Sequence, residues 1–159
     1  MKIYADTSFL LRLLVRDQDT EDAIAAHRKL GRPNLVFTPF HEVEAANALR
    51  IRTFMASHGT GATTKRRALR DETEALRRLQ SAVTTGRFQT TSMPWDAACA
   101  RARSLSESHC HRLGVRSFDL LHVAAAVELL AREFITCDLR QAALAKAAGL
   151  KVHVVHRGS

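Results

Sequence analysis

Apolar side chains follow two different spacings along the chain, which predict short strands and longer helices. Five short apolar runs bounded by polar, glycine or proline residues are typical of buried strands; they lie at 2–5, 35–38, 87–90, 133–136 and 151–154. Helical spacing of apolar residues predicts helices in the intervening segments, at 9–14, 20–30, 40–56, 63–82, 94–108, 118–131 and 139–148. Ser117 is the expected N-cap of the sixth helix, and Gly149 is expected to end the last.

Strands that alternate with longer helices favour a parallel sheet covered on both faces. The expected fold class is therefore α/β, a three-layer α/β/α sandwich with a central parallel sheet. A chain of 159 residues buries roughly 68–70% of its unfolded surface, enough for one core, so we expect a single domain over 1–159. Such sheets bind ligands at the carboxyl ends of their strands, and acids that follow strands are site candidates.

The charge of the chain indicates the kind of partner. It has 24 Lys+Arg and 16 Asp+Glu, a net charge of +8, which favours a polyanionic partner. No apolar run approaches the roughly 20 residues that cross a bilayer, and Asp6 and Arg12 interrupt the apolar stretch that a signal peptide needs. The three cysteines are not closely paired and suggest no disulfide framework. We therefore expect no membrane association and a cytoplasmic location with reduced thiols.

Three aspartates lie where helices are expected to begin. Asp6 follows the first strand, Asp138 follows the fourth, and Asp119 lies in the first turn of an almost uncharged helix. Helix capping explains each one singly, since aspartate is a good N-cap and complements the helix dipole. The same positions place carboxylates at the ligand-binding edge of the sheet. A buried carboxylate is also costly unless it is paired or bound to a metal.

Glu42 and Glu44 share one predicted helix, and helical geometry separates them. At about 100° per residue, Glu44 falls on the more apolar stripe, together with Phe40, Ala48, Ile51 and Met55. Glu42 falls on the opposite side with Ala46 and Thr53, although Leu49 also lies there. Glu44 is therefore the stronger site candidate.

Several carboxylates in one place suit the chemistry of a hard cation. Mg²⁺ prefers oxygen ligands, whereas carboxylates clustered without a metal raise each other's pKa values. One or two bound ions can activate a water and stabilise the leaving oxygen of a phosphodiester. The chain lacks the Gly-x-x-x-x-Gly-Lys and Gly-x-Gly-x-x-Gly sequences of P-loop and dinucleotide-binding proteins. Metal-binding acids in a basic protein favour a nuclease.

The acids and their neighbours resemble the four acidic motifs of PIN-domain ribonucleases. The motifs are Asp6-Thr7-Ser8, Glu44-Ala45-Ala46-Asn47-Ala48-Leu49, Asp119-Leu120-Leu121-His122-Val123-Ala124-Ala125-Ala126 and Thr136-Cys137-Asp138. Their order and spacing cover nearly the whole chain. Within this family, the chain is similar to the VapC-like toxins of bacterial type II toxin–antitoxin pairs.

The resemblance implies an endoribonuclease that depends on Mg²⁺ or Mn²⁺. Its catalytic and metal-binding acids would be Asp6, Glu44, Asp119 and Asp138. It also implies that Thr7 and Thr136 support the site by orienting a metal-bound water, although capping explains either threonine. Family members are commonly homodimers whose site a cognate antitoxin blocks, so these are the expected partners besides RNA. The region 59–86 matches no family motif.

Basic residues supply candidate RNA contacts. Arg116 and Arg140 adjoin the acidic motifs and are the best-placed candidates. A second group of basic residues lies near the start of the long charged helix and is suited to contacts with RNA phosphates. Its members are Lys65, Arg66 and Arg67. Acids interleave further along that helix, which equally fits a solvated face with i,i+4 pairs. His122, one turn from Asp119, is expected to be a hydrogen-bonded core histidine.

The leading hypothesis is a toxin-type PIN ribonuclease that hydrolyses RNA phosphodiester bonds. One alternative is a PIN-like module that binds RNA or regulates without catalysis, and the intact acids argue against it. The other is a different Mg²⁺-dependent phosphohydrolase. A haloacid-dehalogenase-type enzyme would need a second aspartate two residues after the first, where this chain has Ser8.

Overall fold

The computed structural model describes residues 2–15, 20–59 and 61–155, and strands alternate with helices along them. The strands are β1 (Ile3–Ala5), β2 (Leu35–Phe37), β3 (Phe88–Thr90), β4 (Glu133–Thr136) and β5 (Lys151–Val154). The helices are α1 (Thr7–Leu14), α2 (Thr20–Lys29), α3 (Pro39–Ser57), α4 (Ala62–Thr84), α5 (Trp95–Leu113), α6 (Ser117–Glu128) and α7 (Leu139–Ala147). Every predicted strand and helix is present, with ends that differ by a few residues.

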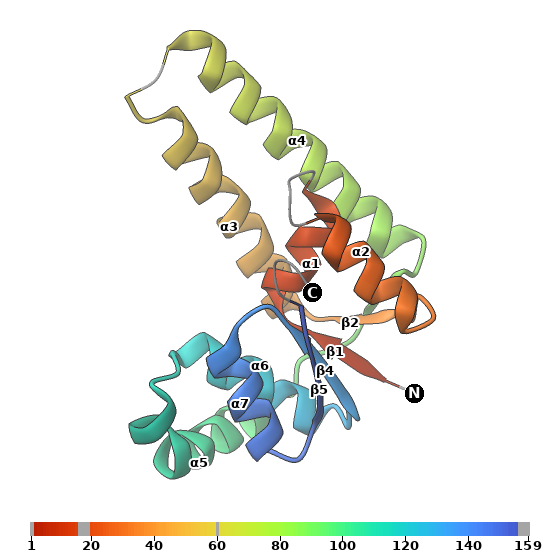
Figure 1. The fold of residues 1–159 in the computed structure, drawn as a ribbon, viewed down its shortest axis with the longest axis vertical. Coiled ribbons are helices and arrows are strands. Elements are labelled where there is room, and N and C mark those ends of the chain that lie inside the picture. Colours follow the sequence, from red (N-terminus) through yellow and green to blue (C-terminus); the bar gives the residue numbers. More distant parts are fainter. Residues whose placement is uncertain (1, 16–19, 60, 156–159) are drawn as a thin grey trace.

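The strands form one parallel sheet in the order β3-β2-β1-β4-β5. β1 is central, with Ile3 beside Leu35 of β2 and beside Glu133 of β4. Parallel neighbours need long crossover connections, and the helices between consecutive strands supply them. Helices lie on both sides of the sheet (Figure 1), which confirms the expected α/β/α sandwich.

Alternating side chains of the strands contribute to two hydrophobic cores, one on each face of the sheet. On one face, Tyr4 and Phe134 pack with apolar residues of α5, α6 and α7. On the other, Ile3 and Ile135 pack with residues of α1, α2, α3 and α4. Successive side chains of a strand point to opposite faces. Because both faces are covered, the three central strands β2, β1 and β4 are buried along their whole length, whereas the edge strands β3 and β5 keep exposed polar residues.

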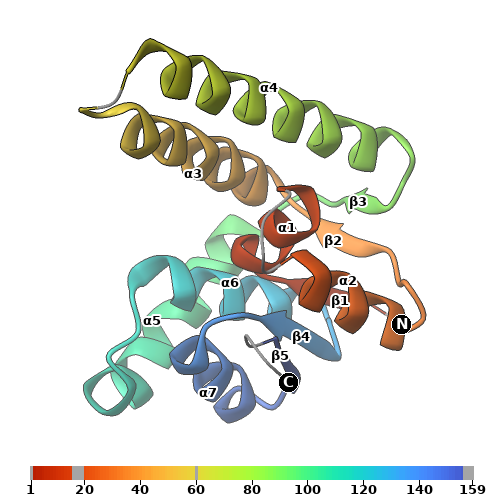
Figure 2. The same ribbon diagram turned by 45° about the horizontal axis from the view of Figure 1, so that its top comes forward.

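α3 and α4 form a helical hairpin that extends away from the sheet (Figures 1 and 2). Near the sheet, Leu49 of α3 and Leu79 of α4 are buried. Farther along α3, Ile51 and Met55 are exposed. The apolar stripe predicted for α3 therefore reaches the core only in its first half. A helix of 19 residues spans about 28 Å at 1.5 Å per residue, far more than the short strands beside it.

Two helix ends differ from the predictions. The N-cap of α6 is Arg116 rather than Ser117, so the expected cap is wrong by one position. Its backbone N–H donates to the Asp119 carboxylate at 3.1 Å, which stabilises the start of the helix without a serine cap. α5 continues to Leu113 and ends where Gly114 adopts a left-handed conformation with φ of 60°.

α6 is buried, as its composition predicts. Leu120 and the run of residues 122–126 are buried between the sheet and the neighbouring helices. Among the described residues, no helix is both long and apolar enough to cross a bilayer. Cys99 and Cys110 are free thiols.

Candidate active site

The predicted acids lie within the first two turns of helices or at their N-caps, and three of these helices follow strands of the sheet. Asp6 follows β1 directly and is the N-cap of α1. Asp138 follows β4 and is the N-cap of α7. Asp119 lies in the first turn of α6, and Glu44 lies in the second turn of α3, the helix that follows β2. In a parallel sheet the carboxyl ends of the strands share one edge, and this edge positions the site.

Asp6 is the most enclosed of the four acids, with 4% of its surface exposed. Oδ1 accepts a hydrogen bond from the backbone N–H of Phe9 at 2.9 Å, and Oδ2 accepts one from the Ser8 hydroxyl at 2.7 Å. Burial raises the pKa of Asp6, and these hydrogen bonds, with the nearby His122, only partly offset that rise. The fold thus holds a carboxylate where water solvates its charge poorly, a position that a cation would stabilise.

Thr136 connects Asp6 to the start of α7. Its buried hydroxyl lies 2.9 Å from Asp6 Oδ2 and 2.7 Å from Gln141 Oε1. The same hydroxyl accepts a hydrogen bond from the backbone N–H of Asp138 at 2.9 Å. A hydroxyl has one proton, so it donates to only one of the two side-chain oxygens. Thr136 therefore contacts both the backbone N–H of Asp138 in the following turn and the carboxylate of Asp6.

Arg116 lies between the carboxylates of Asp119 and Asp138. Its Nε lies 3.5 Å from Asp119 Oδ2, and its Nη2 lies 4.0 Å from Asp138 Oδ2. Asp138 Oδ1 also accepts hydrogen bonds from the backbone N–H groups of Arg140 and Gln141, at 2.7 and 3.1 Å. The Arg116 side chain is 73% exposed, so these ion pairs are weak. Two acids from different helices thus converge on one positive charge.

Glu44 is held by a buried histidine and by Thr7. Its Oε2 lies 2.6 Å from His122 Nε2 and accepts a hydrogen bond from the Thr7 hydroxyl. His122 Nδ1 lies 2.9 Å from the Tyr4 hydroxyl. With a proton on Nε2 only, His122 donates to Glu44 and accepts from Tyr4. Partial burial raises the pKa of Glu44, but its contacts with His122 and Thr7 lower the pKa by more than burial raises it. The net pKa therefore lies below its usual value.

A second buried histidine, His41, supports this network. Its Nδ1 accepts a hydrogen bond from the backbone N–H of Thr38 at 3.1 Å, and its Nε2 donates to the carbonyl of Ala5 at 2.9 Å. Burial and the neighbouring His122 lower the pKa of His41 to about 3, so this ring is neutral at physiological pH. Its ring centroid lies 4.8 Å from that of Tyr4 and 5.0 Å from that of His122. The groups that hold Glu44 are therefore packed on several sides.

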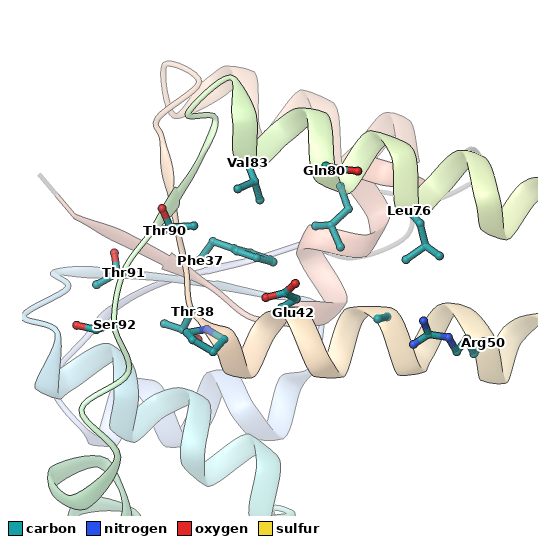
Figure 3. A pocket seen from close by; sticks show the side chains of 13 residues that line it. Phe37, Thr38, Glu42, Arg50, Leu76, Gln80, Val83, Thr90, Thr91 and Ser92 are labelled. Carbon is teal, nitrogen blue, oxygen red and sulfur yellow. The ribbon is translucent and has the colours of Figure 1, made fainter.

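Glu42 lies away from this network. It is exposed and lines a cavity of about 700 Å³ between α3, α4 and the ends of β2 and β3 (Figure 3). Figure 3 shows its carboxylate directed toward the side of α4 that carries Val83. Of the two glutamates, Glu44 is the one that contacts Thr7 and His122.

The four acids have the donor chemistry of a hard-cation site, because carboxylate oxygens are preferred ligands of Mg²⁺ and Mn²⁺. Within residues 2–15, 20–59 and 61–155, no three His, Cys, Asp or Glu side chains are close enough to hold one ion together. The carboxylates contact groups of the chain instead, such as Arg116 and His122. Their residue types fit a divalent cation, and the burial of Asp6 favours one.

The candidate RNA-binding residues fall into two places. Arg116 and Arg140 lie beside the acids, and Arg140 Nη1 donates to the carbonyl of Gly114 at 3.5 Å. The others are Lys65, Arg66 and Arg67. They lie in the first turns of α4, at the end of the hairpin remote from the sheet (Figure 1). Arg67 forms an exposed i,i+4 pair with Asp71 at 4.0 Å, as a solvated face would.

Tyr4, Ser8 and Gln141 belong to the site although sequence patterns did not single them out. Tyr4 precedes Asp6 by two positions, the spacing that places two strand residues on one face. Gln141 is a fully buried polar residue in the first turn of α7. His122 is the hydrogen-bonded core histidine that was expected, and its additional contact with Glu44 joins it to the acids.

Comparisons with known proteins agree with this fold. A family model described as PIN domain matches residues 3–147. Similar solved structures include FitAcB from Neisseria gonorrhoeae, with 19% identity and a TM-score of 0.59, covering 94% of this chain and 95% of that chain. PAE2754 from Pyrobaculum aerophilum has 18% identity and a TM-score of 0.56, covering 96% and 89%. FitAB bound to an IR36 DNA fragment has 20% identity and a TM-score of 0.56, covering 96% and 94%. No curated protein matches the chain.

Proposed function

Because this chain belongs to the PIN-domain family, we propose that it is an endoribonuclease that hydrolyses RNA phosphodiester bonds with Mg²⁺ or Mn²⁺. The observation that carries the proposal is the placement of four acids at helix starts along one edge of the sheet, with Asp6 buried among them. The net charge of +8 supports a polyanionic substrate. The acids then supply the metal-binding groups, and the basic surface attracts the strand.

In this proposal Asp6, Glu44, Asp119 and Asp138 would supply the ligands for divalent metal. Bound metal would supply positive charge at the scissile phosphate and promote attack by water. The threonines position the acids: Thr7 donates to Glu44, and Thr136 contacts Asp6. His122 fixes the carboxylate of Glu44 from the buried side.

Two groups of cations would contact the substrate. Arg116 is exposed beside Asp119 and Asp138, so we assign it, with Arg140, to phosphates next to the scissile bond. The hairpin supplies the second group, Lys65, Arg66 and Arg67. No acid occurs in the sequence between Glu44 and Asp71, so the segment 45–70 carries no negatively charged side chain. We assign it to phosphates farther along the RNA, where binding weakens as salt rises.

We infer that this nuclease is the toxin of a type II pair and acts in the cytoplasm, and that a cognate antitoxin covers its acids. The resemblance of the four motifs to those of VapC-like toxins supports this inference. A FitAB structure of similar fold is bound to a DNA fragment, which agrees with a toxin held by a DNA-binding partner. A homodimer is the expected assembly, and exposed apolar side chains such as Val43 and Leu139 are suited to protein contacts.

Metal-dependent cleavage is the test of this function. A labelled single-stranded RNA is incubated with the full-length protein in Mn²⁺, in Mg²⁺ and in EDTA. We expect cleavage only with metal, and we expect Asp119→Asn to lower the rate at least about tenfold. Cleavage that persists in EDTA and in this variant would contradict the proposal. RNA binding without cleavage would favour the non-catalytic module, and hydrolysis of small phosphomonoesters alone would favour the other phosphohydrolase.

The two glutamates of α3 provide a matched pair of variants. Glu44→Gln keeps the shape of the side chain and an acceptor for Thr7 but removes the charge, so we expect kcat/KM for RNA to fall at least about tenfold. Glu42→Gln, on the same helix, should change kcat/KM less than about twofold because it is an exposed surface substitution. Initial rates of RNA cleavage measure both. Equal losses in the two variants would remove Glu44 from the catalytic set.

A further inference from the structure

A cluster of aromatic rings lies beside the acids, and the proposed hydrolysis leaves it unused. Trp95 is the first residue of α5, and Phe118 is the second residue of α6. Both rings pack edge-to-face against the ring of Phe40, with centroids 6.0 and 5.3 Å away. Phe40 is buried, whereas Trp95 is 46% exposed and Phe118 is 55% exposed. One buried ring thus holds two rings that each present a free surface.

Two of these rings share their helices with the acids, and Trp95 of α5 contacts one of the two, Phe40. Phe118 directly precedes Asp119 on α6, and Phe40 lies one turn before Glu44 on α3. The Phe40 ring also contacts the ring of His122, with centroids 4.6 Å apart, and His122 in turn holds Glu44. The aromatic cluster is therefore continuous with the network that positions the acids.

We propose that Trp95 and Phe118 form a stacking subsite for an unpaired nucleobase of the RNA that enters the site. The inference rests on the proposed function for the identity of the strand. Proteins bind single-stranded RNA by stacking its bases on exposed aromatic side chains and contacting its phosphates with cations. Here the exposed side chain of Arg116 contacts Asp119 and Asp138, and Phe118 directly precedes Asp119 at the start of α6. The start of α6 thus carries an exposed ring, an acid and a candidate phosphate-binding cation.

The surroundings of the rings favour a nucleotide over an apolar protein surface. Exposed rings also occur at protein interfaces, where a partner would have to cover their charged neighbours as well. Beside Phe118 stand Arg116 and Asp119, and such groups are costly to bury without partners. A nucleotide presents a flat apolar base joined to an anion, which matches a ring beside a guanidinium. The subsite would fix the strand relative to the acids and so influence which bond is cut.

Trp95 is the only tryptophan of the chain, so its fluorescence reports directly on this subsite. The full-length Asp6→Asn protein keeps RNA intact and is titrated, with and without Mn²⁺, with a short single-stranded RNA. The comparison probe is a strand of equal length with the same phosphates but no bases. We expect the RNA to quench the fluorescence to saturation and the abasic strand to leave it unchanged. Equal quenching by both strands, or none by RNA in either condition, overturns the subsite.

Variants separate stacking from general binding. Trp95→Leu is expected to raise KM for RNA about 5- to 150-fold, the factor that corresponds to the loss of one stacked base, with kcat changed far less. The matched control is Phe54→Leu, which replaces an exposed phenylalanine (56%, against 46% for Trp95 and 55% for Phe118) on the α3–α4 hairpin. If Trp95→Leu does not fold, Phe118→Leu keeps the tryptophan and gives the fluorescence readout. An equal rise in KM for Phe54→Leu overturns the subsite.

The outcomes distinguish this inference from the proposed function. Base-dependent quenching without any RNA cleavage would support the subsite and contradict the nuclease. Metal-dependent cleavage with no effect of Trp95→Leu on KM would support the nuclease and overturn the subsite. Emission that shifts with protein concentration instead of with RNA would place the rings in an interface between copies of this chain, and would also overturn the subsite.

Discussion

Replacing Asp6 by asparagine is expected to lower kcat/KM for RNA by at least about 100-fold while the fold stays intact. Asparagine has nearly the same shape and is an equally good N-cap for α1, so the N–H of Phe9 keeps its acceptor. The substitution removes a negative charge. Because burial raises the pKa of Asp6, its ionised form is less favourable in the folded chain. The variant should therefore be as stable as the parent or more stable.

Two measurements separate catalysis from folding in this variant. Initial rates of RNA cleavage give the activity, and thermal unfolding in EDTA gives the stability without metal. The matched control is Asp96→Asn, which neutralises an exposed acid in the first turn of α5 and should leave the rate within about twofold. An Asp6→Asn protein that retains more than about a tenth of the parent activity would remove Asp6 from the catalytic set. A lowered Tm would contradict the stability argument.

His122→Ala is expected to lower the free energy of unfolding by about 2–4 kcal/mol. The imidazole is 2% exposed and packs against three aromatic rings, those of Tyr4, Phe40 and His41. Its removal leaves a cavity among these rings and deprives the buried Tyr4 hydroxyl of its contact with Nδ1 of His122. Glu44 also loses the contact that fixes its carboxylate. Urea denaturation measures the change.

A second pair of variants separates the cavity from the lost hydrogen bond. His122→Phe keeps most of the ring volume but removes the imidazole nitrogen that contacts the Tyr4 hydroxyl, at an expected cost of about 1–3 kcal/mol. Adding Tyr4→Phe removes that hydroxyl, and the double variant should regain part of the lost stability because no buried donor remains from this pair. If the double variant is less stable than His122→Phe alone, the hydroxyl of Tyr4 has another partner of equal value.

The helices and strands could be predicted because their patterns arise from local geometry. Strands buried on both faces give short continuous apolar runs, and helices packed on one side give a repeat near 3.6 residues. The N-cap of α6 could not be predicted in this way, because the carboxylate of Asp119 rather than a serine receives the first backbone N–H. The exposure of Ile51 and Met55 could not be predicted either, since it depends on how far α3 extends past the sheet.

The candidate site could be predicted in its acids but not in their supports. An acid that follows a strand or opens a helix can be located from a short stretch of chain. Some partners of these acids come from distant segments: Glu44 meets His122 across 78 positions, and Asp6 meets Thr136 across 130. Local periodicity contains no information about such pairs. For Glu44, helical spacing also predicted which side of α3 the residue lies on.

The class of fold, the four candidate acids and the positive net charge follow from the sequence, because each depends on residue type and on spacing along a few turns. Only tertiary contacts show that His122 links Tyr4 to Glu44, that Arg116 contacts both Asp119 and Asp138, and that Trp95 and Phe118 are exposed around Phe40. These features arise where helices from different parts of the chain meet at one sheet edge. Their positions are fixed by packing, which no single segment specifies.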